Sequence, residues 1–209
     1  DKINEVLKFL KNQIKKKKQI FWVCPLIEES KKLDYSAAVN KFTELSKIFK
    51  GKVGLIHGGL SQDDKNKILY QFLNQNINIL VSTTVIEVGV DFPNATAIII
   101  ENSNKFGLSQ LHQLRGRVGR GLDQGTCILL YKKNLSLNAK KRIKILKKSN
   151  DGFFIAEEDM KLRGYGDVLG YKQSGVKDFK LADPIHHEDL FKIAENNIKD
   201  IELNINNFK

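Results

Sequence analysis

Short apolar runs alternate with amphipathic segments along the first two thirds of the chain, and this alternation constrains the fold more than any other feature. The apolar runs that predict strands are 20–24, 52–56, 78–82, 95–100 and 125–131. The segments with helical spacing of apolar residues between them are 36–49, 61–73 and 108–115. Ser61 is expected to cap the second of these helices, and residues 85–87 are expected to form a helical turn. Strands that alternate with helices of this length predict an α/β fold built on a doubly wound, mostly parallel sheet. Ligands of such sheets gather at the carboxyl ends of the strands, where we expect the glycine-rich turns to lie.

The pattern changes after Tyr131, where no further strand is predicted. The segments expected there are a helix at 137–149, a second helix at 155–162, a glycine-rich loop at 164–175 and a C-terminal helix near 187–203. We therefore divide the chain into residues 1–133, which carry the sheet, and residues 134–209. The second region is expected to consist of a helical hairpin, a loop and a C-terminal helix.

Composition excludes several classes of protein. Hydrophobic residues make up 41% and charged residues 28% of the 209 residues, as in globular chains and unlike disordered ones. No apolar run approaches the roughly 20 residues of a membrane span, and the start lacks a signal-peptide layout, so a cytoplasmic protein is expected. Cys24 and Cys127 lie in strand-like runs and are expected to be small buried hydrophobes rather than disulfide or metal ligands. Residue 1 is Asp rather than Met, so a fragment or a processed product is expected.

The charge balance indicates a polyanionic partner. Lys and Arg number 35 against 24 Asp and Glu, a formal net charge of +11, but Lys is abundant throughout, so its placement is more informative than the total. Between Gln124 and Asn150 there are eight Lys or Arg and no acid. A helical wheel puts five of them on one third of the circumference: Lys140, Lys141, Lys144, Lys147 and Lys148. This stripe is equally consistent with a solvated face and with a contact to a polyanion.

Arg142 falls on the opposite, apolar side of the same helix, where a guanidinium requires a partner. The second helix of the hairpin offers Glu157, Glu158 and Asp159. We therefore predict an antiparallel hairpin over 136–162 that is pinned by a pairing of Arg142 with one of these acids.

Two observations concern nucleotide chemistry. The sequence has no loop of the form GxxxxGK[ST], so this chain does not hold a triphosphate alone. The segment 110–121, however, places three arginines among three glycines and contains no carboxylate: Arg115, Arg117, Arg120, Gly116, Gly119 and Gly121. Arginine offers a fixed fork of donors to phosphate, and glycine permits close backbone approach. On spacing alone, phosphate binding and a solvated basic helix end are equally favoured.

The pattern QxxGRxxR at 113–120 resembles motif VI of superfamily 2 helicases, and residues 81–91 resemble their motif V. Residues 22–30, 101–121 and 150–175 resemble the RecG family of branched-DNA translocases. The resemblance covers nearly the whole chain and implies the second RecA-like lobe of the motor, followed by the translocation motif. The transcription-repair coupling factor shares motif VI and the later element, but the segment 22–30 favours RecG. One departure is Tyr165, where the family commonly has Pro.

The resemblance implies roles for individual residues. ATP with Mg²⁺ would lie between two lobes, held mainly by the first lobe, which this chain lacks. The implied catalytic residues are Arg117, Arg120 and Gln113, and the implied cofactor-binding residues are Glu87, Gly89, Asp91 and Gly116. The implied DNA-binding residues are Thr83, Thr84, His57 and Gly58, although a helix cap for Thr84 and a merely buried or solvated His57 stay open. The implied coupling residues are Arg142, Arg163 and Gln173, and no metal ligand is implied.

The resemblance also implies a function. It is that of the C-terminal motor lobe of an ATP-dependent branched-DNA helicase that regresses forks and processes junctions in DNA repair and recombination. The expected partners are branched or duplex DNA and the N-terminal wedge and first helicase lobe of the same polypeptide, in a monomeric, bacterial, nucleoid-associated protein. The chain alone is expected to be inactive as an ATPase. The alternatives are a duplex translocase of the transcription-repair coupling type and a non-catalytic nucleic-acid-binding module.

Overall fold

The computed structural model describes residues 2–26, 35–83, 92–121 and 124–163, together with the single positions 193 and 197. The chain divides into two compact units, Asp1–Ile155 and Ala156–Lys209, and each is considered by itself. The helical turn expected at 85–87 and the loop expected at 164–175 lie outside the described residues. So does the helix expected near 187–203, apart from positions 193 and 197, which are helical.

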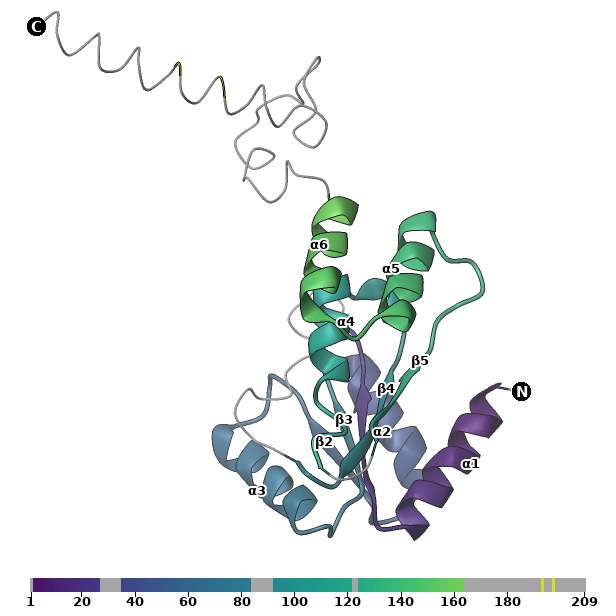
Figure 1. The fold of residues 1–209 in the computed structure, drawn as a ribbon. Coiled ribbons are helices and arrows are strands. Elements are labelled where there is room, and N and C mark those ends of the chain that lie inside the picture. The colour runs from purple at the N-terminus through teal and green to yellow at the C-terminus, as the bar shows by residue number, and fades with distance from the viewer. Residues whose placement is uncertain are drawn as a thin grey trace, which may run out of the picture. The chain divides into compact units, whose positions relative to one another are not determined.

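A five-stranded sheet forms the centre of the first unit (Figure 1). Its strands are β1 (Gln19–Val23), β2 (Val53–Ile56), β3 (Ile79–Ser82), β4 (Ala95–Ile100) and β5 (Thr126–Leu129). Their order is β2-β3-β1-β4-β5, and all four neighbouring pairs are parallel. The predicted α/β sheet is confirmed, and every predicted strand is found within a few residues of its expected position.

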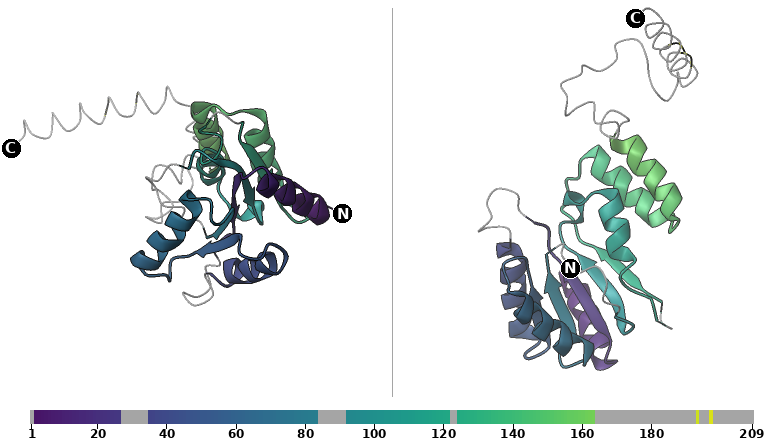
Figure 2. Two further views of the ribbon diagram at one scale, coloured as in Figure 1. Left: turned by 90° about the horizontal axis from the view of Figure 1, so that it is seen from below. Right: turned by 90° about the vertical axis from the view of Figure 1, so that its left-hand side faces the viewer.

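Helices cover both faces of the sheet (Figure 2). They are α1 (Lys2–Lys15), α2 (Ser36–Ile48), α3 (Gln62–Leu73) and α4 (Leu108–Arg115). On one face Trp22 of β1 joins a cluster of buried side chains that includes Leu10 of α1 and Leu45 of α2. On the other face the ring of Phe21 lies 5.3 Å from that of Phe72 in α3. Because successive strand side chains point to opposite faces, the central strand is buried on both, which explains its continuous apolar sequence.

Two further helices follow the sheet, α5 (Leu137–Lys148) and α6 (Gly152–Arg163), and a short 3₁₀ helix, η1 (Ser103–Lys105), precedes α4. Serine hydroxyls start two of the helices, as the sequence predicts for the first. The Oγ of Ser61 accepts a hydrogen bond from the Asp64 amide (3.1 Å), and that of Ser136 accepts one from the Ala139 amide (3.3 Å). Each bond satisfies one of the amides that a helix start leaves without an internal partner.

An arginine of α4 holds the end of α5. The Nη1 of Arg115 donates hydrogen bonds to the carbonyl oxygens of Leu146 (2.7 Å) and Ser149 (2.9 Å). The last carbonyls of a helix have no internal partner and carry the negative end of its dipole, so a guanidinium there is doubly favoured. Arg115 therefore serves to pack α5 against α4.

Arg142 makes the reciprocal contact at the other end of the helix pair. Its Nη1 donates to the carbonyl oxygen of Phe106 (2.6 Å) and its Nη2 to that of Asn104 (3.3 Å). The expectation that an acid of the second hairpin helix satisfies Arg142 was therefore wrong about the partner. The physical reason is that η1 and the turn after it leave main-chain carbonyls that need donors, and a guanidinium can bond to a carbonyl as well as to a carboxylate. The Nε of Arg142 has no hydrogen-bond partner among the described residues.

These two contacts, which we name the arginine clasps, lie at opposite ends of α4. Phe106 and Asn104 precede the helix, whereas Arg115 is its last residue. Along α5, Arg142 lies in the middle of the helix and the Leu146 and Ser149 carbonyls lie at its end, so the second half of α5 is attached to both ends of α4. We therefore treat α4 and α5 as one rigid pair.

The Arg115 clasp is expected to weaken as the pH falls. The Nη2 of Arg115 lies 2.9 Å from the Nδ1 of His112, which can accept its hydrogen bond only when unprotonated there. Burial, and secondarily the charge of Arg115, lowers the pKa of His112 below its ordinary value of 6.5, although Asp151 acts in the opposite sense. The imidazole of His112 therefore binds a proton more readily in the unfolded chain than in the folded one. Its contribution to stability is complete above the ordinary pKa and is lost as the pH falls to the lower pKa of the folded state.

We predict that the urea concentration at the midpoint of unfolding decreases when the pH is lowered from about 7.5 to about 5.5. The variant His112→Asn should show a weaker dependence of this midpoint on pH. Asparagine keeps an acceptor but cannot titrate. An unchanged dependence in the variant would show that His112 does not contribute.

Candidate functional site

The predicted site residues lie at two opposite edges of the sheet. His57 follows β2 and Thr83 follows β3, so both are at the carboxyl ends of the strands. The glycine-rich turn after α4 is at the other edge, because the amide of Gly119 donates to the carbonyl oxygen of Ala95 (3.1 Å), the first residue of β4. Our expectation that the glycine-rich turns gather at the carboxyl ends is therefore wrong for this turn. The length of β4, about 17 Å at the usual rise per residue, separates the two edges.

The segment 113–120, which we name the arginine turn, forms the amino edge. Gln113, Gly116 and Arg120 are exposed, and Arg117 is half-buried. The Nε of Arg120 donates to the Gly116 carbonyl oxygen (2.9 Å), which holds this side chain against the end of α4. Among the residues that the structure describes, the Arg117 guanidinium has no hydrogen-bond or ion-pair partner. Since a half-buried cation without a partner is unfavourable, Arg117 is the side chain here that is most suited to an anionic ligand.

Two of the glycines in this region are required by the fold itself. Gly119 has a φ of +75°, and a Cβ atom there would lie 2.5 Å from the amide nitrogen of Gly125. A Cβ atom at Gly121 would lie 2.6 Å from the carbonyl oxygen of Pro93. The sequence argument that these glycines admit a bulky ligand is thus wrong for both, because they admit neighbouring backbone.

Gly116 differs from these two glycines. It ends α4 with an ordinary helical φ of −68°, and a Cβ atom would meet only the carbonyl oxygens of Gln113 and His112, at 3.5 and 3.6 Å. The packing of the fold therefore does not require glycine at position 116. A ligand that approaches the backbone closely would require it.

His57 is held in a defined orientation at the carboxyl edge. Its ring stacks on Tyr35, with centroids 4.3 Å apart and planes inclined by 12°, and its Nδ1 accepts a hydrogen bond from the Gly59 amide (3.2 Å). Burial and, to a smaller extent, the charge of Lys65 lower the pKa of His57. The neutral ring with Nδ1 as acceptor carries its proton on Nε2, so it presents an N–H donor.

The other predicted DNA-binding residues of this edge differ in exposure. Gly58 is exposed, and a Cβ atom there would meet nothing within 4 Å. Thr83 is buried, and its hydroxyl has no hydrogen-bond partner among the described residues. The hydroxyl of Thr83 therefore does not lie at the surface in this structure.

Sequence reasoning missed a polar network at the same edge. Glu101, the residue after β4, accepts a hydrogen bond from the Nε1 of Trp22 (2.8 Å), and its other oxygen lies 3.7 Å from the Nζ of Lys41. Lys41 also lies 5.2 Å from the centroid of the Trp22 ring. The only signal in the sequence is a single acid directly after an apolar run, which does not reveal partners from β1 and α2.

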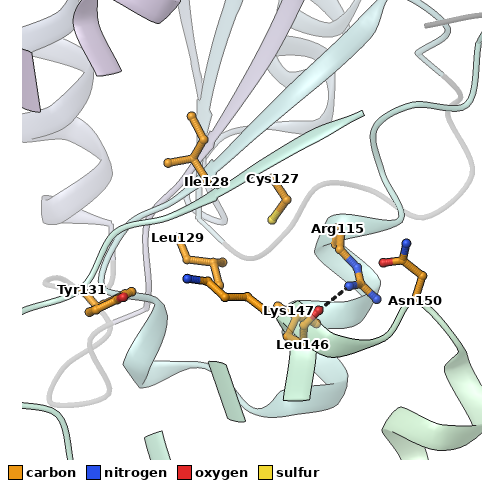
Figure 3. Close-up of a pocket in the computed structure, with 8 residues that line it drawn as sticks. All are labelled: Arg115, Cys127, Ile128, Leu129, Tyr131, Leu146, Lys147 and Asn150. Atoms are coloured by element: carbon orange, nitrogen blue, oxygen red, sulfur yellow. Dashed lines mark hydrogen bonds between the residues drawn. The ribbon is translucent and has the colours of Figure 1, made fainter. Parts of the chain in front are cut away.

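A hollow of about 450 Å³ lies between β5 and the end of α5 (Figure 3). Its lining includes Arg115 and Lys147 as well as Cys127, whose thiol pKa is raised by burial to about 11. Cys127 is only partly buried, whereas Cys24 is fully buried as predicted. Figure 3 shows Arg115 at one end of this hollow, with a hydrogen bond to the Leu146 carbonyl. Of the three arginines of the motif, Arg115 is therefore the one that is engaged in packing.

The remaining predicted residues have no described side chain. Thr84, Glu87, Gly89, Asp91 and Gln173 lie outside the described residues, and only the backbone of Arg163, the last residue of α6, is described. In the described ranges no group of three or more His, Cys, Asp or Glu side chains is arranged to hold a metal ion. None of the helices in that part of the chain has the length and apolar character that a membrane crossing requires.

The two kinds of glycine give a direct test. We predict that Gly119→Ala lowers the free energy of unfolding by about 2–4 kcal/mol, because it combines a left-handed backbone with overlap against Gly125. Gly116→Ala should change it by less than about 1 kcal/mol. Urea unfolding of both variants measures the difference, and equal losses would contradict the distinction.

Residues 1–121 match the helicase conserved C-terminal domain, and residues 149–207 match the C-terminal part of domain 3 of the ATP-dependent DNA helicase RecG. The chain is 49% identical to the ATP-dependent DNA helicase RecG of Bacillus subtilis over 188 residues, which are 89% of this chain and 27% of that protein. It is 44% identical to the ATP-dependent DNA helicase RecG of Thermotoga maritima over 205 residues, which are 97% of this chain and 26% of that protein.

Solved structures agree with the family models. The structure of RecG bound to a three-way DNA junction matches with a TM-score of 0.69 and 43% identity, over 91% of this chain and 24% of that one. The C-terminal part of the Fun30 ATPase domain matches with a TM-score of 0.51 at 17% identity, over 68% of this chain and 44% of that one, which indicates a shared fold. The chain spans about a quarter of the length of the curated relatives above. On this evidence the chain belongs to the helicase conserved C-terminal domain family and carries the C-terminal region of RecG helicases.

Proposed function

We propose that the chain is the second motor lobe of an ATP-dependent helicase that acts on branched DNA and regresses forks. The observation that carries this proposal is the guanidinium of Arg117, which has no partner among the described residues. It lies next to Gly116, where the fold has room for a Cβ atom and yet the sequence has glycine. An arginine and an exposed backbone at one helix end fit a phosphate group that approaches from outside the lobe.

The arginine turn would act on ATP that is bound mainly by another lobe. Mg²⁺-bound ATP supplies the phosphoryl group and its leaving group. Arg117 and Arg120 would stabilise the charge that develops on the transferred group, as arginine fingers do. The bond from the Nε of Arg120 to the Gly116 carbonyl restrains the position of this guanidinium group beside Arg117. Gln113 would orient water or phosphate, and Glu87, Gly89 and Asp91 are proposed to line the same nucleotide.

The carboxyl edge would contact DNA. The Nε2–H of His57 and the open backbone at Gly58 suit a phosphate oxygen, which needs donors that lie at the surface. Thr83 and Thr84 are proposed as further contacts. Because Thr83 is buried, its participation requires its hydroxyl to become exposed.

The α4–α5 pair would couple the two edges. The Arg142 clasp engages the segment that follows the carboxyl edge of β4, and the Arg115 clasp is made by a residue of the arginine turn itself. A rigid pair held at both ends transmits displacement instead of absorbing it. Arg142 is therefore proposed as a coupling residue, together with Arg163 at the end of α6 and Gln173 after it in the sequence.

The proposal extends to organisation and partners. We divide the chain near residue 133, between the segments that match the two family models, into a RecA-like lobe at 1–133 and a translocation element at 134–209. A branched DNA partner is supported by the similar RecG structure, which holds a three-way junction. The complete protein is proposed to be a monomeric cytoplasmic enzyme whose wedge domain and first motor lobe lie outside this chain.

Removal of Arg117 tests the proposed chemistry. In the complete protein that contains this chain, Arg117→Ala should reduce the kcat of DNA-stimulated ATP hydrolysis by about 10³–10⁵, with duplex binding largely kept. Arg117→Lys is the matched control, because it keeps the charge but loses the two-pronged donor geometry, and it should remain strongly impaired. The isolated 209-residue chain should hydrolyse no ATP above background.

A different result would favour a nucleic-acid-binding module. If Arg117→Ala leaves hydrolysis intact and instead reduces the salt dependence of DNA binding by about 0.9 in log–log slope, the arginine contacts DNA phosphate. Turnover by the isolated chain would contradict the two-lobe site.

Removal of the Arg142 clasp tests the coupling. We predict that Arg142→Ala in the complete protein lowers the DNA unwound per ATP hydrolysed by about 2- to 30-fold, while DNA-stimulated hydrolysis itself persists. Thermal unfolding of the variant reports whether the fold is kept, and Arg142→Lys, which retains a donor, should be intermediate. Unchanged unwinding per ATP in a folded Arg142→Ala protein would show that this clasp does not carry the coupling.

A further inference from the structure

One exposed surface of the first unit is strongly positive and has no role in the proposed nucleotide site. It is the outer face of α5, which we name the lysine stripe, and it consists of Lys140, Lys141, Lys144, Lys147 and Lys148. All five side chains are exposed. The inner face of the helix is fixed by the buried side chains of Ala139, Ile143 and Leu146 and by the Arg142 clasp. The stripe therefore cannot turn inward without the loss of that packing.

The lysines of the stripe differ from other lysines of the chain in their surroundings. Lys41, Lys67 and Lys161 each have an acid one helical turn away, at 2.6, 3.9 and 2.9 Å. Within the ranges that the structure describes, none of the five lysines of the stripe has an ion-pair partner. The segment 124–150, which also includes the exposed Lys132 and Lys133, has no Asp or Glu at all. Local acids therefore do not neutralise this surface.

The spacing within the stripe is unfavourable for the isolated helix. Lys140 and Lys144, and likewise Lys144 and Lys148, are four residues apart, where like charges repel along a helix. Lys140 and Lys141 also lie near the positive end of the helix dipole, which increases the repulsion. Lys148 has one compensating contact, with its Nζ 5.6 Å from the centroid of the Phe154 ring. A polyanion bound along the stripe would relieve this repulsion.

The dimensions of the stripe suit duplex DNA. From Lys140 to Lys148 the helix advances about 12 Å at its usual rise. One DNA strand presents a phosphate every 3.4 Å or so along the axis, so about three or four phosphates lie within that length. Lys148 lies near the Phe154 ring, but α5 itself carries no aromatic residue. Its exposed face from Lys140 to Lys148 therefore offers charge rather than a surface on which unpaired bases could stack, and this favours the backbone of a duplex over single-stranded DNA.

We propose that the lysine stripe of α5 is a second DNA-contacting surface that binds the phosphate backbone of a duplex arm. The inference rests on the proposed function for the identity of the polyanion. Because the arginine clasps join the second half of α5 to both ends of α4, DNA held on the stripe is attached to the same rigid pair that carries the arginine turn. DNA position and the proposed nucleotide-sensing arginines would thus be linked through one helix pair.

The test is a charge-matched comparison in the complete protein. The stripe variant is K140Q/K141Q/K144Q/K147Q. The control is K8Q/K11Q/K47Q/K50Q, which removes the same charge from exposed lysines of α1 and the end of α2. Binding of a blunt duplex and of an equally long single strand is measured without nucleotide between about 50 and 200 mM salt. DNA-stimulated ATP hydrolysis is measured at saturating DNA.

We expect the stripe variant to reduce the log–log salt slope for duplex by about 2–4, which corresponds to two to four lost phosphate contacts. The control should reduce it by less than about 1. Loss of like-charge repulsion should leave thermal stability unchanged or raised, so weakened binding cannot be assigned to unfolding. If the fourfold variant is nevertheless unstable, the single change Lys144→Gln should lower the slope by about 0.9.

The outcomes separate this inference from the proposed function. If stripe and control variants bind duplex alike while wild-type ATPase is DNA-stimulated, the stripe proposal is overturned and the motor proposal stands; a stripe that instead serves an acidic protein would give this result. Equal weakening for duplex and single strand would overturn the duplex assignment. If the wild-type protein has no DNA-stimulated ATPase but the stripe variant still loses duplex binding, the motor proposal fails and the stripe proposal stands.

Discussion

Two guanidinium groups that bond to main-chain carbonyls fix the part of this molecule on which the proposed site depends. Arg115 satisfies the end of α5 and Arg142 satisfies the turn before α4, so each helix holds the other. Neither contact involves a carboxylate. A cation bonded to carbonyls stays charged and directional, and it fixes backbone rather than a flexible acidic side chain. This is the physical basis for treating α4 and α5 as one body that carries both the arginine turn and the lysine stripe.

The length of the strands separates the residues proposed to contact DNA from the residues proposed to contact ATP. Residues that follow β2 and β3 lie at the carboxyl edge, and the arginine turn is anchored by Gly119 to the start of β4. A parallel sheet buried on both faces is rigid, so these edges keep a fixed separation. In the proposed motor, DNA would be held at one edge and ATP at the other, and the α4–α5 pair runs between them.

The three arginines of the motif differ from one another in their surroundings, and so do its three glycines. Arg115 packs a helix, Arg120 is restrained by the Gly116 carbonyl, and Arg117 is without a partner in the described chain. Gly119 and Gly121 admit neighbouring backbone, whereas Gly116 is not required by packing. The sequence presents these six residues as one basic, glycine-rich pattern. Only the surroundings of each residue show which of them are available to a ligand.

By itself the sequence determined the α/β class, the five strands, the Ser61 cap and the segment with the arginine turn, because these depend on local periodicity and on residue types that are close along the chain. It also determined the family resemblance, since the motifs are contiguous. The tertiary structure alone decided that Arg142 bonds to the carbonyls of Asn104 and Phe106, and that Glu101 meets Trp22 and Lys41. It also decided that the arginine turn lies at the amino edge of β4. These facts depend on which elements meet in space, and a guanidinium that needs a partner can be satisfied by any carbonyl that the fold brings within reach.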